Sequence, residues 1–126
     1  MSTATSTSVA ETVDTYLASL SEADATTRKA LLARAFVPEC RYSDPHHDLA
    51  GYEAFEGAIV NVVTQYPGFR FQRTTGVDAH YEFVRFGWEF RGPDGSVPLA
   101  GMDAGVLAGD GRLEAIVGFH GELPAA

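Results

Sequence analysis

The chain has 126 residues, enough for one domain, because domains usually contain about 100–200 residues. Its composition is 45% hydrophobic, 21% charged and 11% aromatic, which excludes a largely disordered chain and predicts one globular core. The formal net charge of −8 makes nucleic acids and anionic membrane surfaces poor partners, because an acidic surface repels phosphate groups.

The sequence also lacks the usual features of membrane and secreted proteins. No apolar run approaches the roughly 20 residues that span a bilayer, and the first residues (MSTATSTS) form no basic or apolar signal segment. The single cysteine, Cys40, excludes an internal disulfide and cannot build a thiolate metal site alone. We therefore expect a cytoplasmic protein.

The first half of the chain predicts three helices. Residues 1–8, almost all Ser, Thr and Ala, predict a disordered tail before a single folded domain over 9–126. A first helix is expected from residue 9, with an apolar face made of Val9, Val13, Tyr16, Leu17 and Leu20. Asp24 is expected to cap a second helix, ended by Pro38, whose inward residues are Leu31, Leu32, Ala35 and Phe36. A third helix begins near Gly51 and stops at Pro67-Gly68, with an apolar stripe made of Tyr52, Phe55, Ile59, Val62, Val63 and Tyr66.

The second half predicts strands. A short strand over 40–44 is expected before a loop opened by Pro45, and alternation after Phe69 predicts strands over 69–77, 80–91, 97–107 and 113–120. Asp-Gly pairs at 94–95 and 110–111 are typical of hairpin turns. Three helices followed by antiparallel strands predict an α+β domain in which the helices cover one face of a curved sheet. Such layers leave an apolar hollow, the usual place for a small-molecule site.

Three polar side chains among apolar neighbours are candidates for chemistry. Asp103 interrupts the most apolar predicted strand, and a buried carboxyl has a raised pKa, so it can stay neutral and donate a hydrogen bond. The alternative is that Asp103 faces solvent or bonds to the main chain. Asp44 before a proline is also typical of a turn, and Tyr16 on an apolar helix face is also typical of a core residue.

These three residues lie in the segments Val13-Asp14-Thr15-Tyr16, Tyr42-Ser43-Asp44-Pro45 and Pro98-Leu99-Ala100-Gly101-Met102-Asp103. Together the segments resemble the ketosteroid isomerase and SnoaL-like cyclase branch of the nuclear-transport-factor-2-like superfamily, over about residues 9–123. The resemblance implies a cone-shaped, cystatin-like fold with a curved antiparallel sheet wrapped by the helices. It also implies that Asp44 is a general base and that Tyr16 and Asp103 donate hydrogen bonds to an oxyanion.

The same resemblance implies a substrate pocket and a partner. Trp88 and His120 fall where relatives place pocket-lining aromatics, and Phe86, Phe55 and Ile59 are expected to contact the substrate with them. A histidine at position 120 departs from the isomerases; it could add a second base or bind a polar substrate group. Relatives often pair through the outer sheet face, so a homodimer is expected.

Other kinds of site have less support. Asp44, His46, His47 and Asp48 are metal-ligand types, but adjacent histidines rarely both reach one ion, so neither a metal nor a cofactor is expected. No motif supports a serine or cysteine nucleophile.

The leading functional hypothesis is a small cofactor-free enzyme that performs acid–base chemistry on a hydrophobic, carbonyl-bearing small molecule. The reaction would be a double-bond isomerisation or an aldol-type ring closure. One alternative is a non-catalytic protein that binds a hydrophobic ligand in the same pocket. Another is an epoxide hydrolase in which Asp44 or Asp103 activates water.

Overall fold

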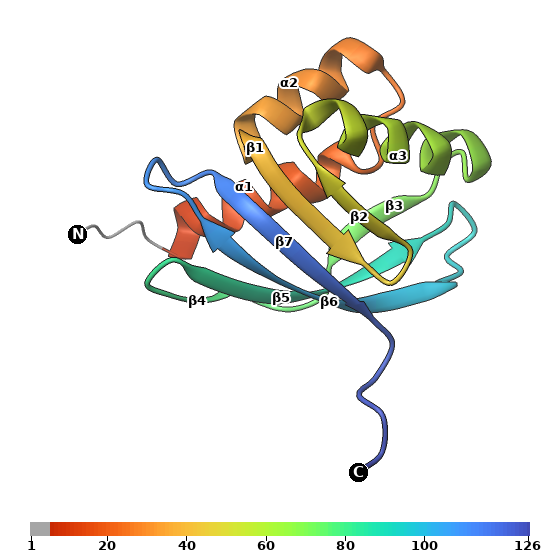
Figure 1. Cartoon of the computed structure of the whole chain (residues 1–126). Helices are drawn as coiled ribbons and strands as arrows, with labels where there is room; N and C mark the ends of the chain where they lie inside the picture. Colours follow the sequence, from red (N-terminus) through yellow and green to blue (C-terminus); the bar gives the residue numbers. More distant parts are fainter. Residues whose placement is uncertain (1–5) are drawn as a thin grey trace.

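Three helices pack against one strongly curved sheet in the part of the chain that the computed structural model describes, residues 6–126. The elements follow one another as α1 (Ser6–Ser19), α2 (Ala25–Ala35), β1 (Phe36–Asp44), β2 (His47–Ala50), α3 (Tyr52–Gln65), β3 (Arg70–Arg73), β4 (Asp78–His80), β5 (Phe83–Arg91), β6 (Leu99–Leu107) and β7 (Leu113–His120) (Figure 1). The first helix begins at Ser6 instead of Val9, so the tail expected over 1–8 is helical at 6–8. Residues 1–5 of that tail lie outside the described residues.

The strands form a 7-stranded sheet in the order β2-β1-β7-β6-β5-β3, with β4 beside β5. The α+β class and the curved sheet are confirmed. Neighbouring strands run antiparallel, except that β1 runs parallel to β7. The expectation of an entirely antiparallel sheet was therefore wrong at this pair. A hairpin turn sets the direction of consecutive strands only, and β1 and β7 come from opposite ends of the domain.

The boundary between α2 and β1 differs from the prediction. Asp24 caps α2 as expected, with Oδ2 accepting a hydrogen bond from the Thr27 N–H at 2.9 Å. The helix ends at Ala35, however, and Phe36 and Pro38 belong to the strand. Phe36 is fully buried, so the apolar pattern continues across the boundary and resembles one longer helix. Pro38 is tolerated because the register of β1 on β7 shifts between Phe36 and Arg41, where the ladder is irregular.

Several other strand boundaries were also wrong. The loop expected after Pro45 is a tight hairpin, because β2 pairs back on β1 from His47 opposite Asp44 onward. The strand expected over 80–91 is divided by a turn in which Tyr81 adopts a φ of 51°. The strands expected over 69–77 and 97–107 are shorter, at 70–73 and 99–107, whereas the strand expected over 113–120 has those bounds.

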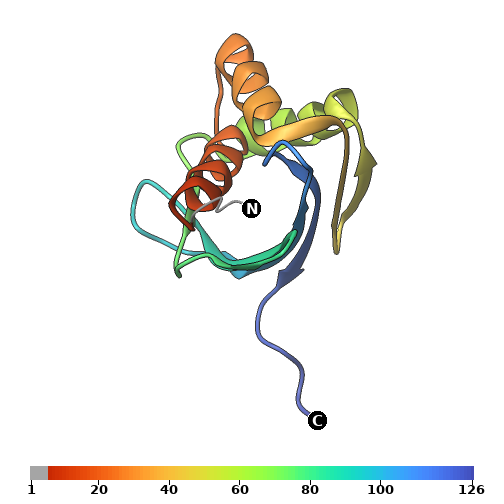
Figure 2. The same cartoon turned by 90° about the vertical axis from the view of Figure 1, so that its left-hand side faces the viewer.

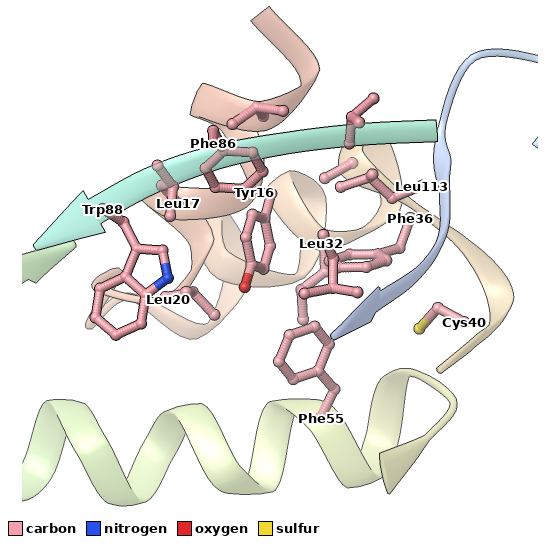
Figure 3. Packing of buried hydrophobic residues seen from close by; sticks show 14 of the residues in the cluster. Tyr16, Leu17, Leu20, Leu32, Phe36, Cys40, Phe55, Phe86, Trp88 and Leu113 are labelled. Atoms are coloured by element: carbon pink, nitrogen blue, oxygen red, sulfur yellow. The ribbon is translucent and has the colours of Figure 1, made fainter. Parts of the chain in front are cut away.

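The core lies between α1 and the concave face of the sheet. Figure 2 shows the sheet curling around α1, with α2 and α3 closing the open side. Tyr16 of α1 packs edge-on against Phe36 and Phe86, with ring centroids 5.4 and 6.3 Å apart (Figure 3). Burying aromatic rings of this size contributes strongly to stability, and it holds α1 in a defined position over the strands.

A buried ion pair joins the two helices that cover this core. Arg28 of α2 is 5% exposed and lies 3.1 Å from Glu56 of α3. Its guanidinium also donates to the Glu22 carbonyl at 2.8 Å, which satisfies the buried charge.

No helix within residues 6–126 is long and apolar enough to cross a membrane.

Candidate active site

Asp103 lies in the middle of β6 on the concave face and is 2% exposed. Its Oδ2 accepts a hydrogen bond from the Tyr16 hydroxyl at 2.8 Å, and its Oδ1 accepts one from the Trp88 Nε1–H at 2.9 Å. In Figure 3 the indole nitrogen of Trp88 lies on the edge of its ring nearer Tyr16, and the Tyr16 hydroxyl lies at the end of its ring. The alternative that Asp103 faces solvent or bonds to the main chain was therefore wrong.

Glycines make room for this carboxyl. Gly118 of β7 is paired with Asp103 of β6. A Cβ added at Gly118 would lie 2.8 Å from Asp103 Oδ1 and 3.5 Å from Asp44 Cβ. Gly118 thus separates two acidic side chains on the strands at either side of it. Because adjacent strands are about 4.8 Å apart, the Cα atoms of Asp44 and Asp103 are about 10 Å apart. Gly101 makes room for the Trp88 side chain, since a Cβ added at Gly101 would lie 2.8 Å from the indole Cζ2.

Burial dominates the ionisation of Asp103. It raises the pKa of Asp103 from 3.8 to about 6, although the hydrogen bonds from Tyr16 and Trp88 lower it. At pH 7 roughly nine such carboxyls in ten are ionised, since each pH unit above the pKa changes the ratio about tenfold. Burial, followed by the charge of Asp103, raises the pKa of Tyr16 well above its usual value, so this phenol stays neutral and remains a donor.

Asp44 is held differently, at the end of β1 beside the β1–β2 turn. Its Oδ2 accepts a hydrogen bond from the Tyr42 hydroxyl at 2.6 Å, and its Oδ1 accepts one from the His46 backbone N–H at 2.8 Å. The Nδ1 atom of His47 lies 3.0 Å from Oδ1 and 3.2 Å from Oδ2. Burial raises the pKa of Asp44, but these hydrogen bonds outweigh it and leave the pKa below 3.8. The two acids are thus shifted in opposite directions.

Both acids line one cavity of about 440 Å³. Its wall contains apolar side chains from α1, α3 and the sheet together with polar groups: Tyr16, Leu17, Leu20, Tyr42, Asp44, His46, His47, Ala58, Asn61, Val62, Gln65, Tyr66, Phe71, Trp88, Phe90, Pro98, Leu99, Asp103 and His120. This volume falls in the range of small-molecule pockets, about 300–1,000 Å³.

Three imidazoles lie around the polar end of the cavity. The His120 ring packs edge-on against Trp88 and tilted against His46, with centroids 5.6 Å apart in both pairs. Burial lowers the pKa of His120; the charge of Asp44 raises it, and His46 and His47 lower it further. The arrangement therefore combines carboxyls, imidazoles and phenols at one end of an otherwise apolar chamber, which suits proton transfer on a largely hydrophobic molecule.

Comparison with known proteins identifies the family. No family model and no curated protein matches the sequence. Among solved structures, the chain is similar to a proposed isomerase of the SnoaL-like family from Agrobacterium tumefaciens str. C58. The identity is 32% over 92% of this chain and 99% of that chain, with a TM-score of 0.84. The chain belongs to the SnoaL-like family.

More distant structures share the fold of this SnoaL-like protein. An NTF2-like protein of unknown function from Exiguobacterium sp. 255-15 has 18% identity and a TM-score of 0.70, covering 89% of this chain and 99% of its own. A proposed SnoaL-like polyketide cyclase from Jannaschia sp. CCS1 has 16% identity and a TM-score of 0.71, covering 90% and 85% respectively. These similarities show the NTF2-like fold, as the sequence predicted.

The site of this SnoaL-like protein contains some of the predicted residues and not others. Tyr16, Asp44 and Asp103 line the cavity, together with Trp88 and His120. The other three predicted contacts, Phe86, Phe55 and Ile59, are buried in the core and do not line it. Phe55, for example, stacks on Tyr42 with centroids 4.7 Å apart, behind the cavity wall. Helical and strand periodicity identified them as buried, but both core and cavity residues satisfy that pattern.

Several cavity residues were not predicted. Tyr42 and His47 hold Asp44, and Asn61 and Gln65 present amides from one face of α3. A signal for His47 existed, because a carboxylate and a histidine three residues apart across a turn can meet. Predicting that contact from the sequence required a hairpin where a loop was expected.

Residues 6–126 contain no group of three or more His, Cys, Asp or Glu side chains placed to hold a metal ion.

Proposed function

We propose that this SnoaL-like protein is a small enzyme that performs general acid–base chemistry on a hydrophobic small molecule bearing a carbonyl group. The observation that carries the proposal is Asp103, a carboxyl that is 2% exposed, is held by two donors, and lines a cavity of about 440 Å³. Buried carboxyls whose pKa is shifted toward neutral pH, in a concave site, are typical of catalytic acids and bases.

Asp103 would be the base that removes a proton from the carbon beside the carbonyl. A pKa of about 6 keeps it ionised at neutral pH but more basic than an exposed carboxylate, which suits proton transfer in both directions. Once Asp103 is protonated, it attracts the Tyr16 hydroxyl less strongly. That hydroxyl can then donate to the negative oxygen of the enolate. Returning the proton to a different carbon isomerises the substrate, and attack of the enolate on a second carbonyl closes a ring.

This assignment of roles differs from the one that the resemblance implied. There, Asp44 was the base and Asp103 a neutral donor. Three donors hold Asp44 and lower its pKa, which makes it the weaker base of the two. Asp103 is mostly ionised at pH 7, so it is not a permanent donor at that pH. The description of the Agrobacterium relative as a proposed isomerase supports the same class of reaction.

The test is exchange of the α-protons of 2-tetralone, a hydrophobic bicyclic ketone, in D₂O, followed by ¹H NMR. Wild type should accelerate the exchange, and Asp103→Asn should lower the rate by ~10²–10⁴-fold, the usual contribution of a positioned base. Asp78→Asn is the matched control, because Asp78 is exposed on β4 and pairs with Arg85 at 2.7 Å, away from the cavity.

Binding of 2-naphthol, measured by fluorescence in the same proteins, separates catalysis from binding. Tight binding without exchange would support the non-catalytic alternative. Equal exchange rates in wild type and Asp103→Asn would show that Asp103 is not the base. Hydrolysis of a hydrophobic epoxide without ketone exchange would support the hydrolase alternative.

A further inference from the structure

A histidine held by a carboxylate faces the same cavity, independent of the hydrogen bonds around Asp103. The His47 ring lies with Nδ1 at 3.0 Å from Asp44 Oδ1, and the side chain of that carboxylate is 9% exposed. An imidazole that donates from Nδ1 to a carboxylate has its ring orientation and tautomer fixed, and it leaves Nε2 for chemistry. Within residues 6–126, Nε2 of His47 has no hydrogen-bond partner, although the ring lines the cavity.

We infer that His47 is a second catalytic residue of this site, which donates a proton from Nε2 to the carbonyl oxygen of the substrate, and that Asp44 is its positioning residue. The inference rests on the proposed function, since it needs a substrate whose carbonyl gains negative charge. It assigns to Asp44 a task that its three hydrogen-bond donors suit: Asp44 fixes the imidazole and stays ionised beside it.

Formation of a neutral enol, in place of the enolate, needs such a group. Asp103 takes the proton from the α-carbon, the electron pair of that C–H bond becomes the new C=C bond, and the carbonyl π electrons move to oxygen. The imidazolium form of His47 gives its Nε2 proton to that oxygen and becomes neutral. A neutral enol results, which costs less in an apolar chamber than a bare enolate does. Reversing both transfers at another carbon completes an isomerisation.

In the part of the chain that the structure describes, the rings of the other two histidines of the cavity, His46 and His120, are not oriented by a carboxylate. His46 reaches Asp44 through its backbone N–H, so the carboxylate does not orient its ring. His120 packs against Trp88 and His46, and its ring makes no hydrogen bond to a carboxylate within residues 6–126. The titratable groups facing His47 are Asp44 and Tyr42 of β1, His46 of the turn and His120 of β7.

The experiment uses the exchange of 2-tetralone α-protons in D₂O and the full chain. His47→Asn keeps an N–H donor for Asp44 but removes the titrating nitrogen, and we expect it to lower the exchange rate by ~100-fold. His80→Asn is the matched control, since His80 is an exposed histidine of β4 and does not line the cavity. Free imidazole should restore part of the rate to His47→Ala and none to Asp103→Asn. Circular dichroism checks that each variant is folded.

The pH profile distinguishes a catalytic role from a structural one. In wild type the rate should fall at high pH, as the imidazolium loses its proton, and at low pH, as Asp103 is protonated. In the pH profile of His47→Asn, the fall of the exchange rate at high pH should be absent and the fall at low pH should remain. Asp44→Asn should lower the rate about tenfold, because the His47 ring then lacks the carboxylate that orients it.

The outcomes separate the two proposals. If wild type exchanges the ketone and Asp103→Asn does not, but folded His47→Asn keeps the wild-type rate and both limbs of the profile, the role of His47 is overturned and the proposed function stands. If His47→Asn is slow but imidazole does not rescue His47→Ala, the residue is structural and the inference is also overturned. If wild type exchanges nothing, the proposed function fails, and the inference fails with it.

Discussion

The ionisation of Asp103 predicts an unusual pH dependence of stability. Burial raises the pKa of this carboxyl from 3.8 to about 6, so the folded chain binds its proton more tightly than the unfolded chain does. The stabilising contribution is therefore complete below about pH 4 and is lost as the pH rises through about 6. The change amounts to about 3 kcal/mol, at about 1.4 kcal/mol per pH unit.

Asp103→Asn removes this titration. The neutral amide keeps the shape of the carboxyl, so its stability relative to wild type should improve between about pH 4 and pH 7, by up to about 3 kcal/mol. At about 4 °C per kcal/mol for a domain of this size, the difference in Tm should change by about 10 °C. The gain accompanies the loss of activity proposed above, as expected for a residue whose burial is maintained for function.

Thermal unfolding followed by circular dichroism at a series of pH values measures the effect. The quantity of interest is the Tm of Asp103→Asn minus that of wild type, because groups that titrate alike in both proteins cancel. Asp44, whose lowered pKa acts in the opposite direction, cancels only in part, because its charge also raises the pKa of Asp103. Asp78→Asn is the control and should show no comparable trend, since Asp78 is exposed on β4. A difference that stays constant from pH 4 to 8, or that grows as the pH falls, would refute the reasoning.

Two further predictions concern glycine packing and assembly. Gly118→Ala should lower the free energy of unfolding by ~2 kcal/mol and slow ketone exchange, because its Cβ would lie 2.8 Å from Asp103 Oδ1 and displace a charged, buried hydrogen bond. Gly57→Ala, in α3 with nothing within 4 Å of its Cβ, should instead stabilise by about 0.5–1 kcal/mol, and chemical denaturation compares the two. Equal effects would contradict the close approach. We expect a homodimer formed through the outer sheet face, where Phe119 is 55% exposed opposite Met102. Phe119→Glu should then convert the dimer to a monomer in light scattering, and a monomeric wild type would contradict this expectation.

Much of the candidate site could be inferred from local sequence. A carboxyl inside an apolar strand is costly to bury without partners, so Asp103 was identifiable as exceptional. Trp88 was identified through the family resemblance, and the structure places it on the same sheet face as Asp103, whose Oδ1 accepts a hydrogen bond from the Trp88 Nε1–H. Helical periodicity placed Tyr16 on the buried face of α1.

The roles of these residues depend on contacts between distant segments. Tyr16 and Asp103 are 87 positions apart, and their hydrogen bond follows from the seating of α1 in the curve of the sheet. The pairing of His47 with Asp44 requires the register of the β1–β2 hairpin, which the turn signal at Asp44-Pro45 does not specify. Likewise, Phe55 and Phe86 satisfied a burial pattern that does not distinguish a core residue from one that faces a cavity.

The sequence by itself determined the α+β class, the family resemblance and the short list of acids, because these depend on composition, periodicity and local motifs. Only the tertiary structure decided which of the two carboxylates has the higher pKa and is the stronger base. The pKa of each carboxyl depends on its burial and on the donors that the fold brings to it. Asp103 is 2% exposed and has two donors, from α1 and β5, whereas Asp44 has three at the margin of the cavity. The parallel β1–β7 pairing places the two acids on either side of Gly118, and the sequence does not reveal this because the three strands lie far apart along the chain.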